Sequence, residues 1–258
     1  FVAGAGVFVL VTFYKKEMAQ LLVDQLKTRY ALDLKVTDVK VNLFSHWPQA
    51  SVELRDVQLI SLNGNRKREP LLKAATISLS FNLRKLMQRQ FVVRTVSLRD
   101  ASLSFSRDSD GDNNFSFKRS LSDTGSSGNL QFDIHKVQIK NTRIHFVNAQ
   151  KQQDIDLVLK DNLLRTRMAA DGAAIDLSGG VEFRQLLFNP VRGPFLKQAR
   201  AELKLRVDWF FESKMMVVYP GSTARINGHP YQLNAWLQLA DSARRLALHV
   251  GTRQLNYA

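Results

Sequence analysis

The chain of 258 residues contains no cysteine. This absence excludes a disulfide framework, a thiolate zinc site and a cysteine nucleophile. The five histidines show neither H-x-H nor H-E-x-x-H spacing, so we expect no metal site. The sequence also lacks a G-x-S-x-G elbow, a Walker A loop and a G-x-G-x-x-G fingerprint after a strand. We therefore expect no catalytic residue and no cofactor, and we interpret the chain as a protein that is not an enzyme.

Acidic residues are scarce beside basic ones. The 23 Asp and Glu stand against 37 Lys and Arg, which gives a formal net charge of +14 at pH 7. A basic excess favours an anionic partner, either nucleic acid or phospholipid head groups. The cations are not interleaved with aromatic residues suited to base stacking, and no nucleic-acid recognition motif is present. We expect no nucleic-acid partner, and a basic nucleic-acid-binding β protein is the second alternative function.

The densest basic segment spans residues 66–99, where nine Lys and Arg accompany a single acid, Glu69. Individually, most of these cations fit a solvated sheet face. Together they fit a position near anionic head groups, where each Lys or Arg contributes about 1 kcal/mol. Arg84, Lys85 and Arg89 are our candidates for head-group contacts.

Long hydrophobic runs are absent except at the start. Residues 1–14 carry no charge and are followed by Lys15 and Lys16. A span needs about 20 apolar residues, so we interpret residues 1–16 as the end of a transmembrane anchor that is cut in this sequence. A signal peptide or a buried strand are the alternatives, but no small-x-small cleavage site follows. The orientation stays open, because the positive-inside rule compares both flanks.

The next segment is amphipathic. Met18, Leu21, Leu22, Leu26 and Tyr30 follow helical spacing, which predicts a juxtamembrane helix over residues 17–32. Its apolar stripe either packs on the following sheet or lies on the lipid surface, and we favour packing on the sheet.

From residue 33 the hydrophobic period becomes two, which indicates a mainly β body. A helical turn is predicted at residues 83–89, and loops at 106–129 and 189–194. The Asp-rich segment 108–114 departs from a calcium-binding loop in its Gly and Glu positions, so we interpret it as a turn. Strands are predicted at residues 72–81, 91–98, 130–147, 155–168, 173–188, 199–211 and 231–239.

One pattern occurs four times: L-K-V-T-D-V-K-V from Leu34, V-E-L-R-D-V-Q-L from Val52, V-S-L-R-D-A-S-L from Val96, and V-Q-I-K-N-T-R-I from Val137. In each copy the apolar phase shifts by one residue at an Asp or Asn. Such a shift would turn every later side chain to the other face, so the chain must bulge or bend there. We interpret these four residues as positions where the backbone bulges or bends, within repeated hairpin units, and not as catalytic residues. They are Asp38, Asp56, Asp100 and Asn141.

A sheet with one apolar face must cover that face. From alternation alone, a closed sandwich or barrel is the default, and an open groove is the alternative. Each residue in constant apolar phase is compatible with ordinary core and with a groove, and in the groove reading Leu54→Glu or Leu79→Glu abolishes lipid occupancy while the sheet stays folded. The groove candidates are Val36, Val41, Leu43, Val52, Leu54, Val57, Leu59, Ile77, Leu79, Leu103 and Phe105.

The order of these features resembles the AsmA family of bacterial envelope proteins, best over residues 1–117. The apolar run leads into a helix, the V-T-D-V-K-V strand, a His46-Trp47-Pro48 turn and V-E-L-R-D-V-Q-L. The segments P-L-L-K-A-A and V-S-L-R-D-A-S-L-S-F follow in the same order. Three positions depart from the family pattern and suggest a divergent branch. They are Leu32 where Gly is usual, Ala101 where Pro is common, and Phe115 where Trp often stands.

The resemblance implies a single-pass inner-membrane protein of a Gram-negative bacterium with its body in the periplasm. The implied fold is an elongated, twisted antiparallel β-sheet curled into an apolar groove of the repeating β-groove type. Residues 33–117 would form the AsmA-like N-terminal β region, 118–129 a flexible loop, and 130–258 a continuing sheet that is truncated at its end.

The implied function is to bind or conduct phospholipid acyl chains along the groove, in support of lipid transport between the inner and outer membranes. The alternative is a non-enzymatic factor for outer-membrane protein assembly. The expected partners are phospholipids, the inner membrane through the N-terminal helix, and other envelope proteins.

Overall fold

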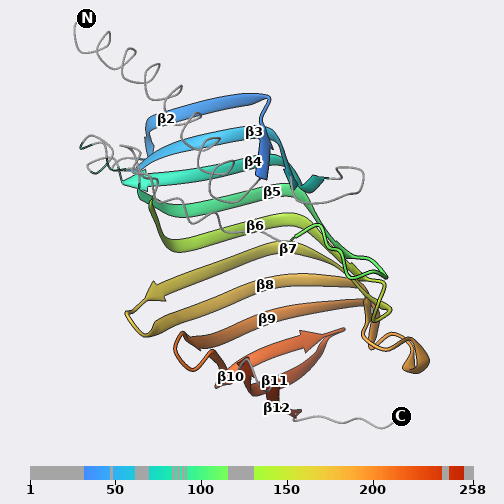
Figure 1. Cartoon of the computed structure of the whole chain (residues 1–258). Coiled ribbons are helices and arrows are strands. Elements are labelled where there is room, and N and C mark those ends of the chain that lie inside the picture. Colours follow the sequence, from blue (N-terminus) through green and yellow to red (C-terminus); the bar gives the residue numbers. More distant parts are fainter. Residues whose placement is uncertain are drawn as a thin grey trace, which may run out of the picture.

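The computed structural model describes residues 32–46, 49–61, 70–82, 85, 88, 90, 92–115, 131–239 and 244–252. These residues form one 12-stranded sheet, and the expectation of a mainly β body is confirmed. Apart from the first two strands, the strands follow one another in chain order across the sheet (Figure 1). The strands are β1 (Leu32–Lys35), β2 (Asp38–His46), β3 (Gln49–Ser61), β4 (Pro70–Asn82), β5 (Val92–Arg107), β6 (Gln131–Asn148), β7 (Gln153–Met168), β8 (Gly172–Leu187), β9 (Leu196–Phe210), β10 (Met215–Ile226), β11 (His229–Leu239) and β12 (Arg244–Gly251).

Strands β1 and β2 act as one edge strand. Both pair antiparallel with the same edge of β3, with Leu34 opposite Leu59 and Val41 opposite Val52. The pairing is interrupted at residues 36–37, where the Thr37 amide still donates to the Arg55 carbonyl at 3.1 Å.

Strands β5 and β6 are parallel, whereas the other paired strands are antiparallel. The expected all-antiparallel sheet is therefore corrected to a mixed one. Residues 108–130 join β5 to β6. A parallel pair requires a connection long enough to return the chain to the end of the sheet where the first strand began, and this segment has that length. Leu103 pairs with Ile144, and Phe105 with Phe146.

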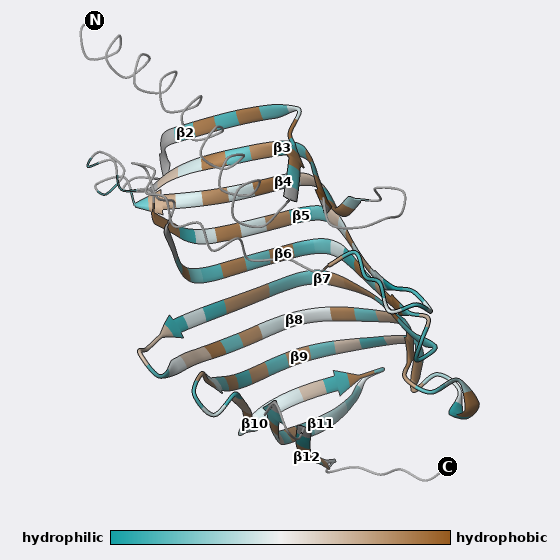
Figure 2. Ribbon diagram, viewed as in Figure 1, coloured by the Kyte–Doolittle hydropathy of each residue, from teal (hydrophilic) through white to brown (hydrophobic). Residues whose placement is uncertain are grey.

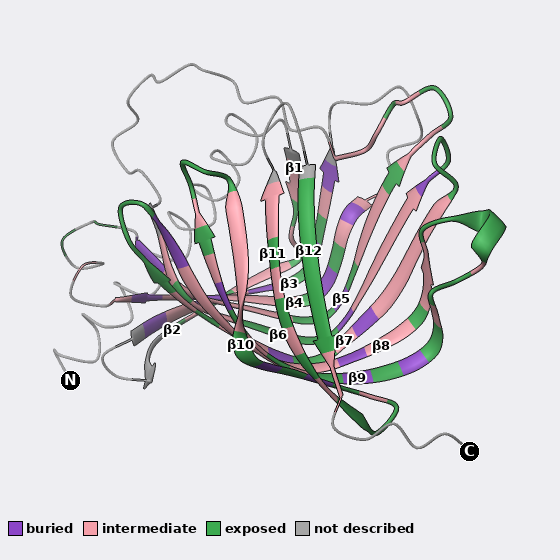
Figure 3. Cartoon of the chain, turned by 90° about the horizontal axis from the view of Figure 1, so that it is seen from below, coloured by how far each residue is buried: buried purple, intermediate pink, exposed green. Residues whose placement is uncertain are grey.

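Alternation along the strands gives the sheet two different faces (Figure 2). In β9, the side chains of Ala201, Leu203 and Leu205 are less exposed than those of Glu202 and Lys204. Cross-strand pairing carries this phase from strand to strand, because opposed residues point to the same side. We name the side with Leu203 and its register partners the apolar face, and the other side the polar face. The sheet is strongly curved when viewed along the stack of strands (Figure 3).

The predicted phase shifts are present and lie side by side. Asp56, Asp100 and Asn141 have left-handed φ values of 49°, 49° and 47°. The fourth shift occurs beside Asp38, at residues 36–37, where the edge strand is interrupted between β1 and β2. Asp38 is not among the residues with positive φ. The prediction of a backbone bend is therefore confirmed at three residues. At the fourth, the bend lies one or two residues before the predicted position.

These shifts form a continuous kink line across the strands from β1/β2 to β7. On one side of the line Leu54, Ile77, Leu98, Ile139 and Asn162 are register partners. On the other side the corresponding row is Val57, Ala74, Ala101, Thr142 and Leu159. The repeats therefore align a bend across the sheet. Only the first two copies share a hairpin, since the last two lie on the parallel pair.

The kink line ends at β8. The register shifts there, because residues 160–161 of β7 lie opposite Gly180 alone. A β-bulge of this kind absorbs the extra residue and restores simple alternation. Glycine is required beside it: a Cβ on Gly179 would lie 2.3 Å from Asn162 Oδ1 and 2.4 Å from the Asp161 carbonyl oxygen.

The strand predictions for residues 72–81, 130–147, 155–168, 173–188, 199–211 and 231–239 are confirmed, and the predicted strand 91–98 is the first part of β5. Two strands were missed, β10 and β12. Pro220 and Gly221 lie within β10, where the structure accommodates them as a bulge between Val218 and Ser222. Lys85 is helical, as predicted for the turn after β4.

The predictions for residues 1–16 and 17–32 fall outside the described residues, except for Leu32, which begins β1. Within the described part of the chain, no helix is both long and apolar enough to cross a membrane. The flexible loop predicted at residues 118–129 also lies outside the described residues.

Candidate functional site

The apolar face is continuous from the first strand to the last. Across β7 to β9, Leu164, Leu177 and Leu205 are register partners. Val207, two residues after Leu205 on the same face, continues the path through its partner Val218 to Ala235 and Leu248. Every strand contributes apolar side chains to this side because the shifts in register preserve the phase. The sequence therefore builds one uninterrupted surface rather than separate patches.

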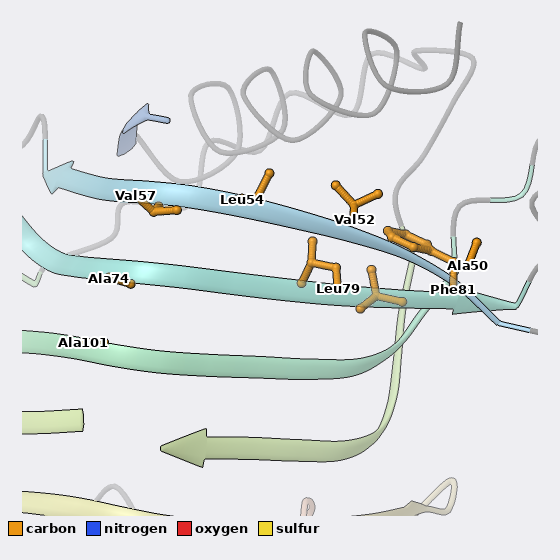
Figure 4. Packing of buried hydrophobic residues seen from close by; sticks show 9 residues of the cluster. Ala50, Val52, Leu54, Val57, Ala74, Leu79, Phe81 and Ala101 are labelled. Carbon is orange, nitrogen blue, oxygen red and sulfur yellow. The ribbon is translucent and has the colours of Figure 1, made fainter. Parts of the chain in front are cut away.

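Over β3 to β5 the side chains of the apolar face are buried or partly buried. Val52 and Leu79 expose 2% and 6% of their surface, and with Phe81 they belong to one cluster of packed side chains (Figure 4). The cluster also contains small residues, Ala74 and Ala101, at the kink line. These side chains contribute to stability in the manner of a core, at roughly 25 cal/mol per Å² of apolar area removed from water.

The structure brings most of the predicted groove residues together. Those in the buried cluster or packed against it are Val36, Val41, Val52, Leu54, Val57, Ile77 and Leu79. Leu59 and Leu103 both pair with Leu72, which packs on the cluster, and so lie on the same face. Leu43 lies in β2, and nothing is described of its side chain.

Phe105 belongs to an aromatic group at one end of the strands. Its ring lies 6.0 Å from that of Phe115 in an edge-on arrangement, and Phe115 lies 6.1 Å from Phe146. Such separations are favourable for aromatic pairs. Phe115 follows the turn at residues 108–112, in which the Asp108 carboxylate accepts hydrogen bonds from the amides of Asp110 and Asp112. The interpretation of the Asp-rich segment as a turn is confirmed.

At the other end of the sheet the same face is open. On β12, Leu246 and Leu248 expose 66% and 61% of their surface. They pair with Leu237 and Ala235 of β11, so they continue the apolar face and do not belong to the polar one. The groove candidates named from the sequence lie on β2 to β5, except for Val36 in the break between β1 and β2, because the resemblance covered only that part. For the later strands, the period-two alternation of residues 155–250 was the sequence feature that could have identified the residues of the apolar face.

Polar groups on the apolar face are satisfied internally. Asn162 is buried and donates from Nδ2 to the Gly180 carbonyl at 2.9 Å. Thr142 is also buried, and its hydroxyl donates to the Lys140 carbonyl at 3.2 Å. Ser222 accepts a hydrogen bond from the Arg206 amide at 3.0 Å. Because these groups bond to the backbone, they do not demand water on this face.

The polar face is crossed by ion pairs between neighbouring strands. Arg143 donates two hydrogen bonds to Asp156, at 2.9 and 2.8 Å, and Lys160 lies 2.8 Å from Glu182. The hydrogen bonds from Arg143 hold the pKa of Asp156 below its ordinary value, and Lys160 does the same for the pKa of Glu182. Asp208, through a hydrogen bond, raises the pKa of Tyr219.

A hollow of about 570 Å³ follows the kink line on the polar face. Gln58, Lys73, Ser102 and Arg143 line it from adjacent strands. Many of its charges are already paired: Asn141 donates to Asp100 at 2.7 Å, and Arg143 is held by Asp156. We interpret this hollow as the outer consequence of the bend. It contains none of the predicted groove residues except Val57.

The head-group candidates are only partly described. Lys85 accepts through its carbonyl from the amides of Gln88 and Gln90, and its own amide donates to Asn82 Oδ1 at 3.3 Å. Arg84 and Arg89 lie outside the described residues. Their role stays a prediction.

Comparison with protein-family models gives a match to the model described as AsmA family, over residues 1–212. The chain belongs to the AsmA family. The match extends well past residue 117, through β9, so the resemblance drawn from the first part of the sequence is confirmed. No curated protein matches the chain.

Membership of the AsmA family and the large β-sheet fit a role in the bacterial envelope or in lipid transport. The family's generally envelope-associated character agrees with the apolar start of the chain.

Proposed function

We propose that this AsmA-family chain is a non-enzymatic periplasmic protein, held at the inner membrane by its N-terminal segment, whose apolar face binds and conducts phospholipid acyl chains. The observation that carries this proposal is the unbroken apolar face, which is buried over β3 to β5 and open at β12. A surface of this extent needs a cover, and acyl chains match its chemistry without requiring hydrogen bonds.

The dimensions suit an elongated path. Neighbouring strands lie about 4.8 Å apart, so the stack from the β1/β2 edge to β12 extends about 50 Å. Each CH₂ group buried on the face contributes roughly 0.8 kcal/mol. An acyl chain that moves from one row of side chains to the next keeps its buried area, so movement along the face needs no catalytic residue. Head groups would remain in water at the rims of the apolar face.

The experiment is native mass spectrometry with lipid extraction on the full chain, purified in mild detergent from a Gram-negative host. Leu54→Glu and Leu79→Glu are poor probes, because both side chains are buried and a carboxylate there would lack a partner. The double change Leu246→Glu and Leu248→Glu alters exposed positions of the same face instead. We expect co-purified phospholipid in the unchanged chain and a clear loss in this variant.

The matched control is Ala247→Glu. Ala247 lies between the two leucines on β12, is exposed, and points to the polar face. We expect it to keep its lipid. A photo-reactive residue at position 248 should cross-link to phospholipid, and one at position 247 should not. A lipid-free, monodisperse chain, or equal cross-linking at both positions, would contradict the proposal and favour a protein scaffold for envelope assembly.

A further inference from the structure

The connection between β8 and β9 displays apolar side chains to solvent. Val191 exposes 93% of its surface, Phe195 76% and Phe188 50%. The loop projects from the ends of β8 and β9 (Figure 1) and is exposed over most of its length (Figure 3). Single exposed apolar residues are ordinary, but three within eight residues form a concentrated patch.

The loop is held in one shape by its own backbone. Asn189 caps a 3-10 turn at Pro190–Arg192, and its side-chain oxygen accepts a hydrogen bond from the Val191 amide at 3.0 Å. The Phe195 amide donates to the Leu186 carbonyl at 2.8 Å. With Pro190 and Pro194 limiting the backbone, the apolar side chains are presented by an ordered loop, so binding costs little conformational entropy.

The segment that carries this patch is charged with one sign along the chain. Residues 183–201 contain four cations and no acid. On the neighbouring strand β7, Asp154 lies opposite Leu187 and accepts a hydrogen bond from Gln185 at 3.2 Å. Arg192 and Lys197 form no ion pair with any residue in the described ranges, and both are exposed. The combination of protruding Val and Phe with unpaired cations is complementary to an anionic phospholipid surface, where apolar side chains enter the interface and each cation adds about 1 kcal/mol.

The opposite ends of β7 and β9 also expose apolar side chains and can be compared with this loop. Met168, Trp209 and Phe211 are exposed there, but the adjoining turns carry the acids Asp171 and Glu212 beside the cation Lys214. Those turns are therefore mixed in charge, unlike the purely cationic segment of the β8–β9 loop.

We propose that the loop from Phe188 to Lys197 is a bilayer-docking element that inserts Val191 and Phe195 into the interface of an anionic phospholipid membrane. The loop connects the ends of β8 and β9, close to Leu186 and Leu196, which pair with each other on the apolar face. The bilayer contact is thus placed at the rim of that face. This inference does not depend on lipid occupying the face itself.

The absence of cysteine makes the test direct, since Val191→Cys introduces the only thiol of the full chain. The thiol is labelled with the polarity-sensitive fluorophore NBD, and the chain is mixed with vesicles of phosphatidylethanolamine and phosphatidylglycerol. We expect a blue shift and quenching by nitroxides on the acyl chains. Vesicles of phosphatidylcholine alone, or high salt, should weaken both signals.

Met168→Cys, labelled in the same way, is the matched control for a chain that reaches the vesicle by its N-terminal segment. It should stay in a water-like environment. Arg192→Gln and Lys197→Gln should each lower the fraction of lipid-exposed label at position 191 about fivefold. A water-like label at position 191, an equal response at position 168, or a shift produced only by added envelope proteins would overturn the proposal. Lipid lost from the apolar face in mass spectrometry would leave this result unchanged, so the two proposals fail separately.

Discussion

The two ends of the sheet carry the same alternation of side chains but meet solvent differently. Val52 and Leu79, on β3 and β4, are almost completely buried, whereas Leu246 and Leu248, on β12, are more than half exposed. Both pairs lie on the apolar face. Alternation therefore creates the face, but it does not decide whether the face serves as core or as an available surface. We infer that the β3–β5 end stabilises the fold and that the β12 end is free to meet a ligand.

The backbone differs between the two regions as well. The kink line crosses β3 to β7, where Asp56, Asp100 and Asn141 adopt left-handed conformations. In β9, by contrast, alternation is regular from Ala199 to Val207. The continuous kink line thus belongs to the part of the sheet that contains the buried cluster. Beyond it, one non-glycine residue inside a described strand has a left-handed φ, Gln198 near the start of β9, at 50°.

The sharpest way to break this comparison is to place the same charge at both ends. Leu79→Glu should lower the free energy of unfolding by more than about 4 kcal/mol, because it removes a buried side chain and introduces an unpartnered carboxylate. Leu248→Glu should change it by less than about 0.5 kcal/mol. Urea unfolding followed by tryptophan fluorescence measures both. Similar losses in the two variants would show that the β12 end is also core.

A smaller effect is expected at the kink line. Asn141→Val places a β-branched residue at a φ of 47° and removes the hydrogen bond to Asp100, at a cost of about 2–3 kcal/mol. Asn141→Gly relieves the strain and should lose only the hydrogen bond. Asn234→Val, on the regular strand β11, should be close to neutral. The same unfolding assay applies, and an Asn141→Val variant as stable as Asn141→Gly would refute a conformational role.

The smallest effect concerns the ion pairs of the polar face. Asp156→Asn should cost about 1 kcal/mol at pH 7, because Arg143 donates two hydrogen bonds to a largely buried carboxylate. The pKa of Asp156 is lowered from 3.8 in the folded state, so this contribution is present above that pH and is lost as the pH falls below it.

Glu202→Gln is the counterpart near the other end. Its partner, Arg225, lies 3.7 Å away and both side chains are mostly exposed, so no measurable change is expected. Unfolding free energies at pH 7 and at about pH 3 separate the two cases, the lower value lying below the ordinary pKa of Asp. A difference between the unchanged chain and Asp156→Asn that persists undiminished at the lower pH would contradict the assigned cause.

Much of the local structure could be predicted from particular residues. The four-fold pattern of apolar positions around Asp or Asn predicted the bends, because a phase shift is a local property that any sheet with one buried face must correct. The same alternation placed Val52, Leu54, Val57 and Leu79 on one side. It did not predict β10, a strand that contains Pro220 and Gly221. Their neighbours in β9 and β11 hold the strand together across a bulge.

The sequence by itself determined the mainly β architecture, the apolar face and the bends at Asp56, Asp100 and Asn141. Each follows from short-range periodicity and backbone preference. Only the tertiary structure decided that β5 and β6 run parallel, that the bends line up, and that one end of the face is buried while the other is open. These features depend on which strands become neighbours and how the sheet curves, and pairing between distant segments leaves no mark in the local alternation.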